Sequence, residues 1–509
     1  MEENRNKRIA KNTLFMYFRM LFLMFVSLFT VRIVLKNLGV EDYGIYNLIA
    51  GVVVLFNFIA NSSSAATSRY LNFALGENDY EKANRVYSSS VVIHFVVAVL
   101  IVLLSETVGL WLVNHYLVIP QERIVATNYV FHLSVFVTFL NIMNIPNNAS
   151  IISNEKMSFY AVVSILDGFF KLVIAYIISI VNKDKLIAYA ILIAIVTLIN
   201  FFINKTYVNL KFKICRFKFH NDKEMYKELV SFSGWSLLSS VGSTCSNQVL
   251  TMILNHFFGV VVNAAMGIAN QVNNTVYRFV SNFQVAFEPQ ITKSYASKEN
   301  DYLLSLIFKT SKFSFYLLWF FVLPLSLNVS TVLTVWLSEV PEYSVIFLRL
   351  ILIYSLIDSI CGPLWMVSYA IGNIRNYQIV AFVIPVLSVP VAWMLFKFGL
   401  PPYWIVILRV LNNFIFSLWR LGYLKKRMNF PVLIFIKNVI LPGLFVVTIS
   451  SIVSFMSFYF TRFNNIVQFF VSCTATVVVN IVAMYYIGCT NDEKQYVRNI
   501  ISKYIKKGK

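Results

Sequence analysis

Amide side chains and one arginine form a polar stripe in an apolar segment, "NQVNNTVYRFVSN", residues 270–282. Their spacing of four positions places them on one face of a helix. An arginine at the centre of a membrane helix costs about 2.5–3.5 kcal/mol on insertion scales, so this face should avoid lipid. Amides suit sugar hydroxyls, and arginine can grip a phosphate through two N–H groups. The stripe favours a cavity lining over hydrogen bonds between helices; its members are Asn270, Asn274, Arg278 and Asn282.

The first two apolar segments carry the same chemistry. Asn57 and Asn61 are four positions apart and run toward Arg69, and Arg19 lies at a depth similar to that of Arg278. For any single asparagine, hydrogen bonding between helices is the commoner role. Together with the stripe, Asn57, Asn61 and Arg19 are candidate substrate-binding residues.

Two carboxylates lie within apolar segments and are candidates for coupling to H⁺ or Na⁺. Asp167 precedes Lys171 by four positions in "LDGFFKL", so the two can neutralise each other on a helix. A structural ion pair and a functional site are equally supported there. If the pair functions, Asp167 accepts the ion and Lys171 binds phosphate once the pair opens. Asp358 is the second candidate, with an interhelical hydrogen bond as its alternative role.

The composition indicates an integral membrane protein. Of 509 residues, 58% are apolar, 16% aromatic and only 13% charged, against about a quarter charged in soluble domains. Apolar stretches of about 20 residues recur without the alternation of membrane strands, which predicts helices. We predict an all-α protein with 14 spans: 12–36, 44–65, 88–113, 124–149, 157–181, 186–207, 229–255, 260–286, 308–330, 345–370, 376–397, 402–424, 432–457 and 463–488.

The distribution of basic residues predicts the orientation. Of 43 Lys and Arg, 31 lie in the N-terminal segment, the even-to-odd loops and the C-terminal tail, 7 at the opposite face and 5 within spans. By the positive-inside rule both termini are cytoplasmic. The net charge of +20 does not indicate nucleic acid, because the basic clusters border spans and suit anionic headgroups.

Catalytic and metal-binding motifs are missing from the sequence. The five cysteines have no metal-ligand or CxxC spacing, and no GxGxxG, Walker, HExxH or GxSxG motif occurs. No catalytic residue, metal site or cofactor is therefore predicted. Transport driven by ATP hydrolysis in this chain is disfavoured, which leaves an ion gradient as the candidate energy source.

Similar strings recur in the two halves of the chain. "ENDY" occurs at 77–80 and 299–302, "LGVEDYGIYNL" from Leu38 parallels "FGVVVNAAMGIAN" from Phe258, and Pro146 parallels Pro363. The separation between the members of each pair is nearly constant, which predicts two parallel six-span repeats. The predicted parts are an N-terminal lobe (1–210), a basic connection (211–228), a C-terminal lobe (229–427) and two extra helices with a basic tail (428–509).

These strings, with "FEPQITKSYA" at 287–296 and the plan of two times six spans plus two, resemble the O-antigen and polysaccharide flippases (Wzx-type) of the multidrug/oligosaccharidyl-lipid/polysaccharide exporter superfamily. The resemblance implies two six-helix lobes around a central cavity. It implies a multi-pass protein of the bacterial inner membrane that moves an undecaprenyl-diphosphate-linked oligosaccharide to the periplasmic leaflet by alternating access. Polysaccharide-assembly proteins are the implied partners.

Two other functions compete with this one. A cation-coupled multidrug exporter of the same superfamily would need a more apolar or acidic cavity, whereas the predicted spans place five basic and only two clearly acidic side chains within the membrane. A membrane glycosyltransferase or polymerase would need a large periplasmic loop, and the longest predicted one spans only residues 331–344. The charge balance favours an anionic substrate.

Overall fold

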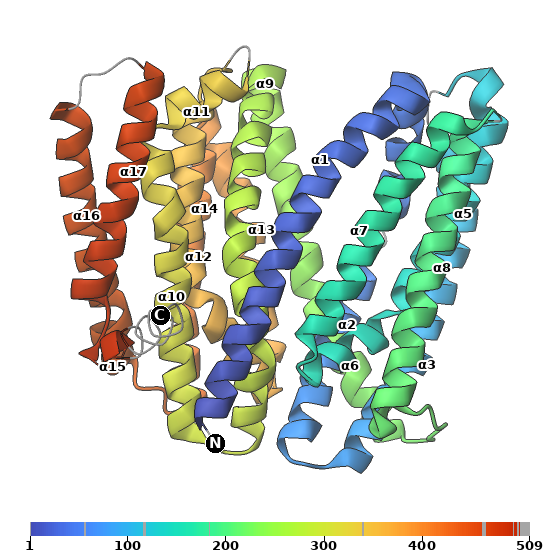
Figure 1. Ribbon diagram of the computed structural model, residues 1–509, viewed down its shortest axis with the longest axis horizontal. Helices are drawn as coiled ribbons and strands as arrows, with labels where there is room; N and C mark the ends of the chain where they lie inside the picture. Colours follow the sequence, from blue (N-terminus) through green and yellow to red (C-terminus); the bar gives the residue numbers. More distant parts are fainter. Residues whose placement is uncertain are drawn as a thin grey trace, which may run out of the picture. The chain divides into compact units, whose positions relative to one another are not determined.

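A computed structural model describes residues 2–54, 57–115, 119–182, 184–337, 340–460, 465–491, 493–495 and 498. These residues form α-helices with short π and 3₁₀ segments and, within the described ranges, no strand, so the predicted all-α class is confirmed (Figure 1). The helices are α1 (Glu2–Val54), α2 (Asn57–Gly76), α3 (Tyr80–Leu104), α4 (Leu110–His115), α5 (Ile124–Met143), α6 (Ile145–Ser153), α7 (Met157–Ile180), α8 (Lys185–Lys211), α9 (Lys223–Ala296), α10 (Asn300–Leu327), α11 (Val329–Trp336), α12 (Ser344–Ile371), α13 (Arg375–Lys397), α14 (Trp404–Met428), α15 (Val432–Phe435), α16 (Leu441–Phe460) and α17 (Asn465–Ala483).

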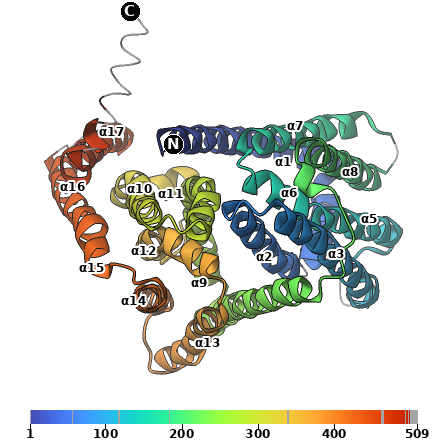
Figure 2. The same cartoon turned by 90° about the horizontal axis from the view of Figure 1, so that it is seen from below.

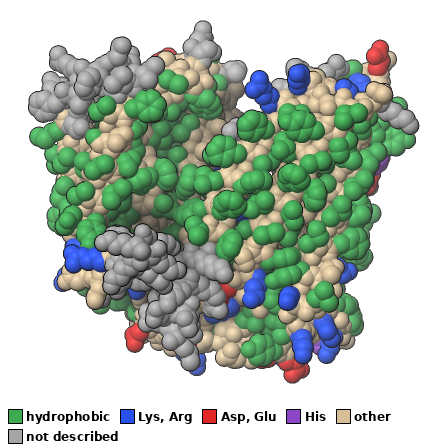
Figure 3. All heavy atoms as spheres, viewed as in Figure 1, with side chains coloured by type: hydrophobic (Ala, Val, Ile, Leu, Met, Phe, Trp, Pro, Cys, Tyr) green, Lys and Arg blue, Asp and Glu red, His purple; other side chains and the backbone are tan. Residues whose placement is uncertain are grey.

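Eleven segments of the described chain are long and apolar enough to cross a membrane. Figure 3 shows hydrophobic side chains over most of the visible helix faces, with Lys and Arg near helix ends. Outward apolar faces are expected where lipid is the solvent. The protein is therefore a multi-pass membrane protein.

In α1 and in α9, a glycine with non-helical backbone angles joins two helical stretches at a kink. Gly39 interrupts α1 at φ 81° and ψ 168°, and Gly259 interrupts α9 at φ 80° and ψ −175°. Glycine adopts these angles because it has no Cβ. The two predicted spans on either side of each glycine are therefore present as two helical stretches, and a kink at the glycine joins them where the sequence predicts a short connection.

Residue contacts divide the chain into two compact units. Unit 1 contains residues 1–241, 285–300 and 369–379, and unit 2 contains 242–284, 301–368 and 380–509. The ends of α9 and α12 thus belong to unit 1 although much of both helices belongs to unit 2. The lobe boundaries predicted from the sequence remain predictions.

Within unit 1, α7 lies along α1, and α5 lies beside α8 (Figures 1 and 2). Buried apolar residues gather in clusters between these helices; Ile49, Val130 and Phe131 are fully buried in one of them. Unit 2 contains a large apolar cluster built from α9, α10, α12 and α14, with Leu352 and Val406 fully buried. Because lipid is as apolar as these side chains, close packing between the helices stabilises the clusters more than removal from water does.

Repeat geometry confirms the internal duplication. The turn after α2 has Asn78 at φ 58°, and the turn after α9 has Lys298 at φ 57°. The backbone bonds beside these two residues match as well: Asp79 N–H donates to Ala74, and Glu299 N–H donates to Ser294. In this register Asn78 corresponds to Lys298, whereas the two "ENDY" strings would pair it with Asn300. The strings are therefore two positions out of the structural register. A shift of two positions between sequence similarity and structural equivalence is tolerated in a loop, because loops vary more in length and sequence than the helices they connect.

A third pair of positive-φ residues extends the duplication to the following helices. Glu155, after α6, has φ 57°, and Gly372, after α12, has φ 87°. Their separation along the chain equals that of Pro146 and Pro363, the two matched prolines. Each N–H donates to the carbonyl three positions earlier, on Ile152 and Tyr369.

Candidate transport cavities

Unit 1 contains an open cavity of about 580 Å³, here named the amino-terminal cavity. Helices α1, α5, α6, α7 and α8 supply its walls. Its lining is rich in amides: Asn141, Asn144, Asn148, Asn200 and Asn204. Each carboxamide offers a donor and an acceptor, which suits polyhydroxylated ligands.

The predicted pair Asp167 and Lys171 lies in this cavity, on α7. Lys171 Nζ is 2.7 Å from Asp167 Oδ2, and Asn200 Nδ2 donates to Asp167 Oδ1 at 2.6 Å. The side chains of Asp167 and Lys171 are 29% and 43% exposed. The carboxylate is thus partly accessible and held by two partners, an arrangement that can open to admit a cation.

Arg19 lies near the same cavity. Its guanidinium stacks over the ring of Tyr160 at 4.9 Å from the centroid, and Tyr160 lines the cavity. The stacking fits the affinity of guanidinium for aromatic faces. The side chains of Asn57 and Asn61 lie outside those that the structure describes.

Unit 2 encloses a smaller cavity of about 240 Å³, here named the carboxy-terminal cavity. Asp358 lines it and accepts a hydrogen bond of 2.5 Å from the Tyr277 hydroxyl. Two arginines line the same space: Arg409, over the ring of Tyr354, and Arg420, which donates to the Cys361 carbonyl at 3.2 Å.

The sequence prediction misses Arg420 as a cavity residue, because it counts this arginine with the cytoplasmic end of its span. Arg420 is buried, with 5% of its surface exposed. A signal is available in the sequence: Arg409, Asn413, Ser417 and Arg420 follow one another at steps of 4, 4 and 3 along α14. The same rule applied to Asn141, Asn144 and Asn148 finds the amino-terminal cavity.

The polar stripe on α9 lies elsewhere. Asn274 and Arg278 are exposed, and Asn282 Nδ2 donates to the backbone carbonyl of Arg278 at 2.8 Å. Among the described residues, the members of the stripe, Asn270 included, line neither cavity. A neighbouring amide points inward instead: Asn273 accepts a bond of 2.7 Å from Ser355.

The two cavities occupy repeat-equivalent positions. The register that relates Glu155 to Gly372 also pairs lining residues of one cavity with lining residues of the other. The pairs are Val137 with Tyr354, Asn141 with Asp358, Asp167 with Ile384, and Lys171 with Ser388. Duplication therefore placed a polar cavity in each half.

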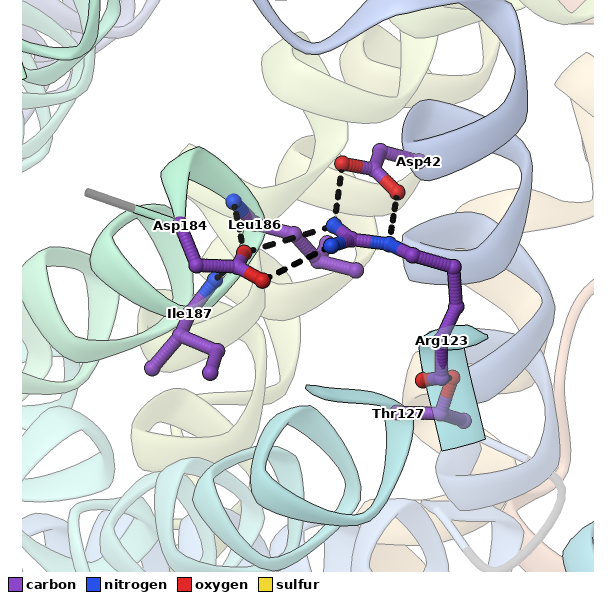
Figure 4. Close-up of polar contacts among 6 residues, drawn as sticks. All are labelled: Asp42, Arg123, Thr127, Asp184, Leu186 and Ile187. Atoms are coloured by element: carbon purple, nitrogen blue, oxygen red, sulfur yellow. Dashed lines mark hydrogen bonds and ion pairs between the residues drawn. The ribbon is translucent and has the colours of Figure 1, made fainter. Parts of the chain in front are cut away.

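An ion cluster joins three segments of unit 1 (Figure 4). Arg123 forms paired bonds to Asp42, beyond the α1 kink, and donates to Asp184 at 2.7 Å. Asp184 also caps α8 by accepting from Leu186 N–H and Ile187 N–H. Burial raises the pKa of Asp184, but the Arg123 and backbone hydrogen bonds outweigh it and lower the pKa below its usual value.

Solved structures with this fold are membrane transporters. A MATE mutant aligns with a TM-score of 0.73 at 15% identity, covering 84% of this chain and 97% of its own. A Vibrio cholerae MATE transporter gives 0.70 at 17% identity, covering 84% and 98%. A MOP superfamily transporter from Pyrococcus furiosus, described as having a binding pocket of reverse polarity, gives 0.69 at 15% identity, covering 82% and 95%. Among curated proteins, none matches the chain.

The chain thus has the fold of the MATE and MOP superfamily transporters. The family model described as "Polysaccharide biosynthesis protein" matches residues 9–294, more than half of the chain. The chain belongs to this family, and its fold is the one that the predicted superfamily implies.

Proposed function

We propose that the protein flips an undecaprenyl-diphosphate-linked oligosaccharide from the cytoplasmic to the periplasmic leaflet of the bacterial inner membrane. The observation that carries the proposal is the amide-lined cavity in a member of a polysaccharide biosynthesis family. An asparagine side chain has both donors and an acceptor, so a lining rich in asparagines suits sugar hydroxyls, although one of the five, Asn200, already donates to Asp167. Polysaccharide-assembly proteins on either side of the membrane would supply and consume the substrate.

Ion coupling is part of the proposal. Asp167 is held by Lys171 and Asn200, and Asp358 by Tyr277, so each half contains a carboxylate in a polar cavity. Intramembrane carboxylates are typical of ion pathways. Uptake of H⁺ or Na⁺ at one of them would favour one conformation over the other and so drive the cycle.

The test is flipping in proteoliposomes. Lipid-linked oligosaccharide should cross to the opposite leaflet only with the protein present, and faster under an imposed H⁺ or Na⁺ gradient. Asp301→Asn, an exposed carboxylate at the start of α10, is the matched control for Asp167→Asn and Asp358→Asn and should leave the rate unchanged. Flipping that ignores both gradients would leave facilitated equilibration as the mechanism.

A cation-coupled drug exporter is the second candidate, favoured by the MATE transporters among the similar structures. Efflux of organic cations without oligosaccharide flipping would support it. The arginines of the carboxy-terminal cavity weigh against a cationic substrate.

Orientation is tested by labelling with a membrane-impermeant maleimide. Cysteines introduced at Glu122 and Glu342 should react from the periplasm, whereas one at Lys218 should not. Reversed labelling would place both termini outside, contrary to the positive-inside distribution.

A further inference from the structure

The C-terminal ends of α2, α6, α9 and α12 all lie in unit 1. A helix C-terminus leaves backbone carbonyls without partners in the helix and carries partial negative charge. Bringing such ends together is unfavourable unless cations or other donors meet them. The ends of α2 and α6 come from the first half of the chain, and the other two come from the second half.

Cations meet two of these ends, and each cation comes from the opposite half of the chain. Lys293, on α9, donates to the Ser153 carbonyl at the end of α6, at 2.5 Å. Arg69, on α2, donates to the Tyr369 and Ala370 carbonyls at the end of α12, both at 3.2 Å. Ser153 and Ala370 are equivalent in the register that pairs Glu155 with Gly372. The two contacts are therefore reciprocal: each half sends a cation to the same helix position of the other.

The positive-φ residue that follows the helix end is Glu155 after α6 and Gly372 after α12, and the two make different contacts. Gly372 has a φ of 87°, which favours glycine, and an added Cβ there would displace the end of the Arg69 side chain from its position. Its counterpart Glu155 keeps a positive φ although it has a side chain. The Glu155 carboxylate, 3% exposed, accepts from Gln290 at 2.6 Å and pairs with Lys293 at 2.9 Å. Non-glycine residues hold such a conformation where the surroundings fix them, often at functional positions.

The helix ends also touch backbone to backbone. A Cβ added at Gly76 would lie 2.7 Å from the Lys293 carbonyl oxygen and 2.8 Å from Ala296 Cβ. The Ser297 hydroxyl donates to the Gly76 carbonyl at 2.5 Å. Gly76 and Ala296 are equivalent in the register that pairs Asn78 with Lys298, so the α2 and α9 ends meet as related surfaces.

We infer that these contacts form a latch between the two halves of the chain that closes the predicted cytoplasmic end of the transport path. Arg69 and Lys293 make the contacts that hold the latch closed. Glu155 and Gly372 lie directly beside the carbonyl groups that these two cations bind. The inference rests on the proposed alternating-access function, in which the halves must separate at this end to admit a cytoplasmic substrate. Polar contacts to carbonyls suit this task because water can replace them when the latch opens, whereas a packed apolar interface would hold more tightly.

The experiment measures opening without any substrate. Spin labels at exposed Lys218 and Lys298, both in unit 1, report the separation of the halves by double electron–electron resonance in nanodiscs. Loss of both charged contacts in Arg69→Ala/Lys293→Ala should shift the ratio of long to short distances roughly tenfold toward long. The control is Lys82→Ala, which removes an ion pair with Glu77 confined to the first half and should change nothing.

A second variant separates the latch from backbone strain. Glu155→Gly relieves the positive φ but removes the carboxylate, so it should also favour the long distance. Asn78→Gly relieves a positive φ of similar size at an exposed residue and should not. Unchanged distances in both Arg69→Ala/Lys293→Ala and Glu155→Gly, at unchanged melting temperature, would overturn the latch. A shift in distances without any oligosaccharide flipping would retain the latch and reject the proposed substrate.

Discussion

The amino-terminal and carboxy-terminal cavities share repeat positions but not charges. In the first, Asp167 and Lys171 lie on α7, where the second has Ile384 and Ser388. In the second, Asp358 lies on α12 where the first has Asn141. The duplicated fold thus fixes where a cavity forms, while single substitutions decide which charges line it.

The partners of the two carboxylates differ in consequence. Lys171 compensates the charge of Asp167. Asp358 instead accepts a hydrogen bond from the neutral hydroxyl of Tyr277 and lines the same cavity as Arg409 and Arg420. A direct lysine pair must break before a cation binds, whereas a phenol can stay bonded. We therefore expect the two halves to respond differently to the same Asp→Asn change.

The largest effect should come from outside both cavities, at Arg278. If the exposed stripe on α9 receives the diphosphate, Arg278→Ala should lower flipping roughly ten- to a hundredfold, because a charge-assisted contact contributes about 1.5–3 kcal/mol. Arg278→Lys should restore the rate only in part, since the planar fork is lost. Asn270→Ala and Asn274→Ala should have milder effects. The measurements are flipping rate and amount of protein in the membrane; an unchanged rate would move the phosphate site to Lys171 or Arg19.

Asp167→Asn should come next, with gradient-driven flipping reduced about tenfold, a usual size for coupling between two sites. The double variant Asp167→Asn/Lys171→Met discriminates between the two roles. A purely structural pair predicts recovery in the double variant, because no unpaired charge remains. An ion-binding role predicts that the response to the gradient stays lost. Rates with and without the gradient decide between them.

Tyr277→Phe should have a smaller effect, about threefold on the ion concentration that half-activates flipping, since it removes one hydrogen bond from Asp358. Ser355→Ala, which removes a hydrogen bond to Asn273 on the same pair of helices, is the matched control. Equal effects of the two variants would make Asp358 a structural residue and leave the ion site in the amino-terminal cavity alone.

The smallest effect concerns the Asp42, Arg123 and Asp184 cluster, which has no counterpart among the contacts described in unit 2. Because the folded pKa of Asp184 is lowered, its contribution to stability is complete above the ordinary aspartate pKa of about 4 and is lost as the pH falls below it. Arg123→Lys should cost about 1 kcal/mol at pH 7. Thermal unfolding between pH 6 and pH 3 should show a steeper loss in the wild type than in Asp184→Asn; parallel curves would contradict this.

The sequence by itself determined the membrane class, the helical spans, the duplication and the Asp167–Lys171 contact. These features depend on local rules: apolar length sets a span, and a spacing of four sets a contact along one helix. The places of the glycine kinks could be predicted in part, because Gly39 and Gly259 fall at matching positions in the repeated strings; the kinked geometry of the two connections came from the structure.

Only the tertiary structure decided which distant residues meet. Glu155 and Lys293 are 138 positions apart, and Arg123 lies 81 positions from Asp42. No periodicity encodes such pairs, because they depend on how whole helices pack. Asn273 and Asn274 are adjacent in the polar segment of α9, but their environments differ: Asn273 accepts a hydrogen bond from Ser355, and Asn274 is exposed. A helix turns by about 100° per residue, so Asn273 and Asn274 point in different directions. The helices that pack beside α9 decide which of its polar side chains form packing contacts and which stay exposed.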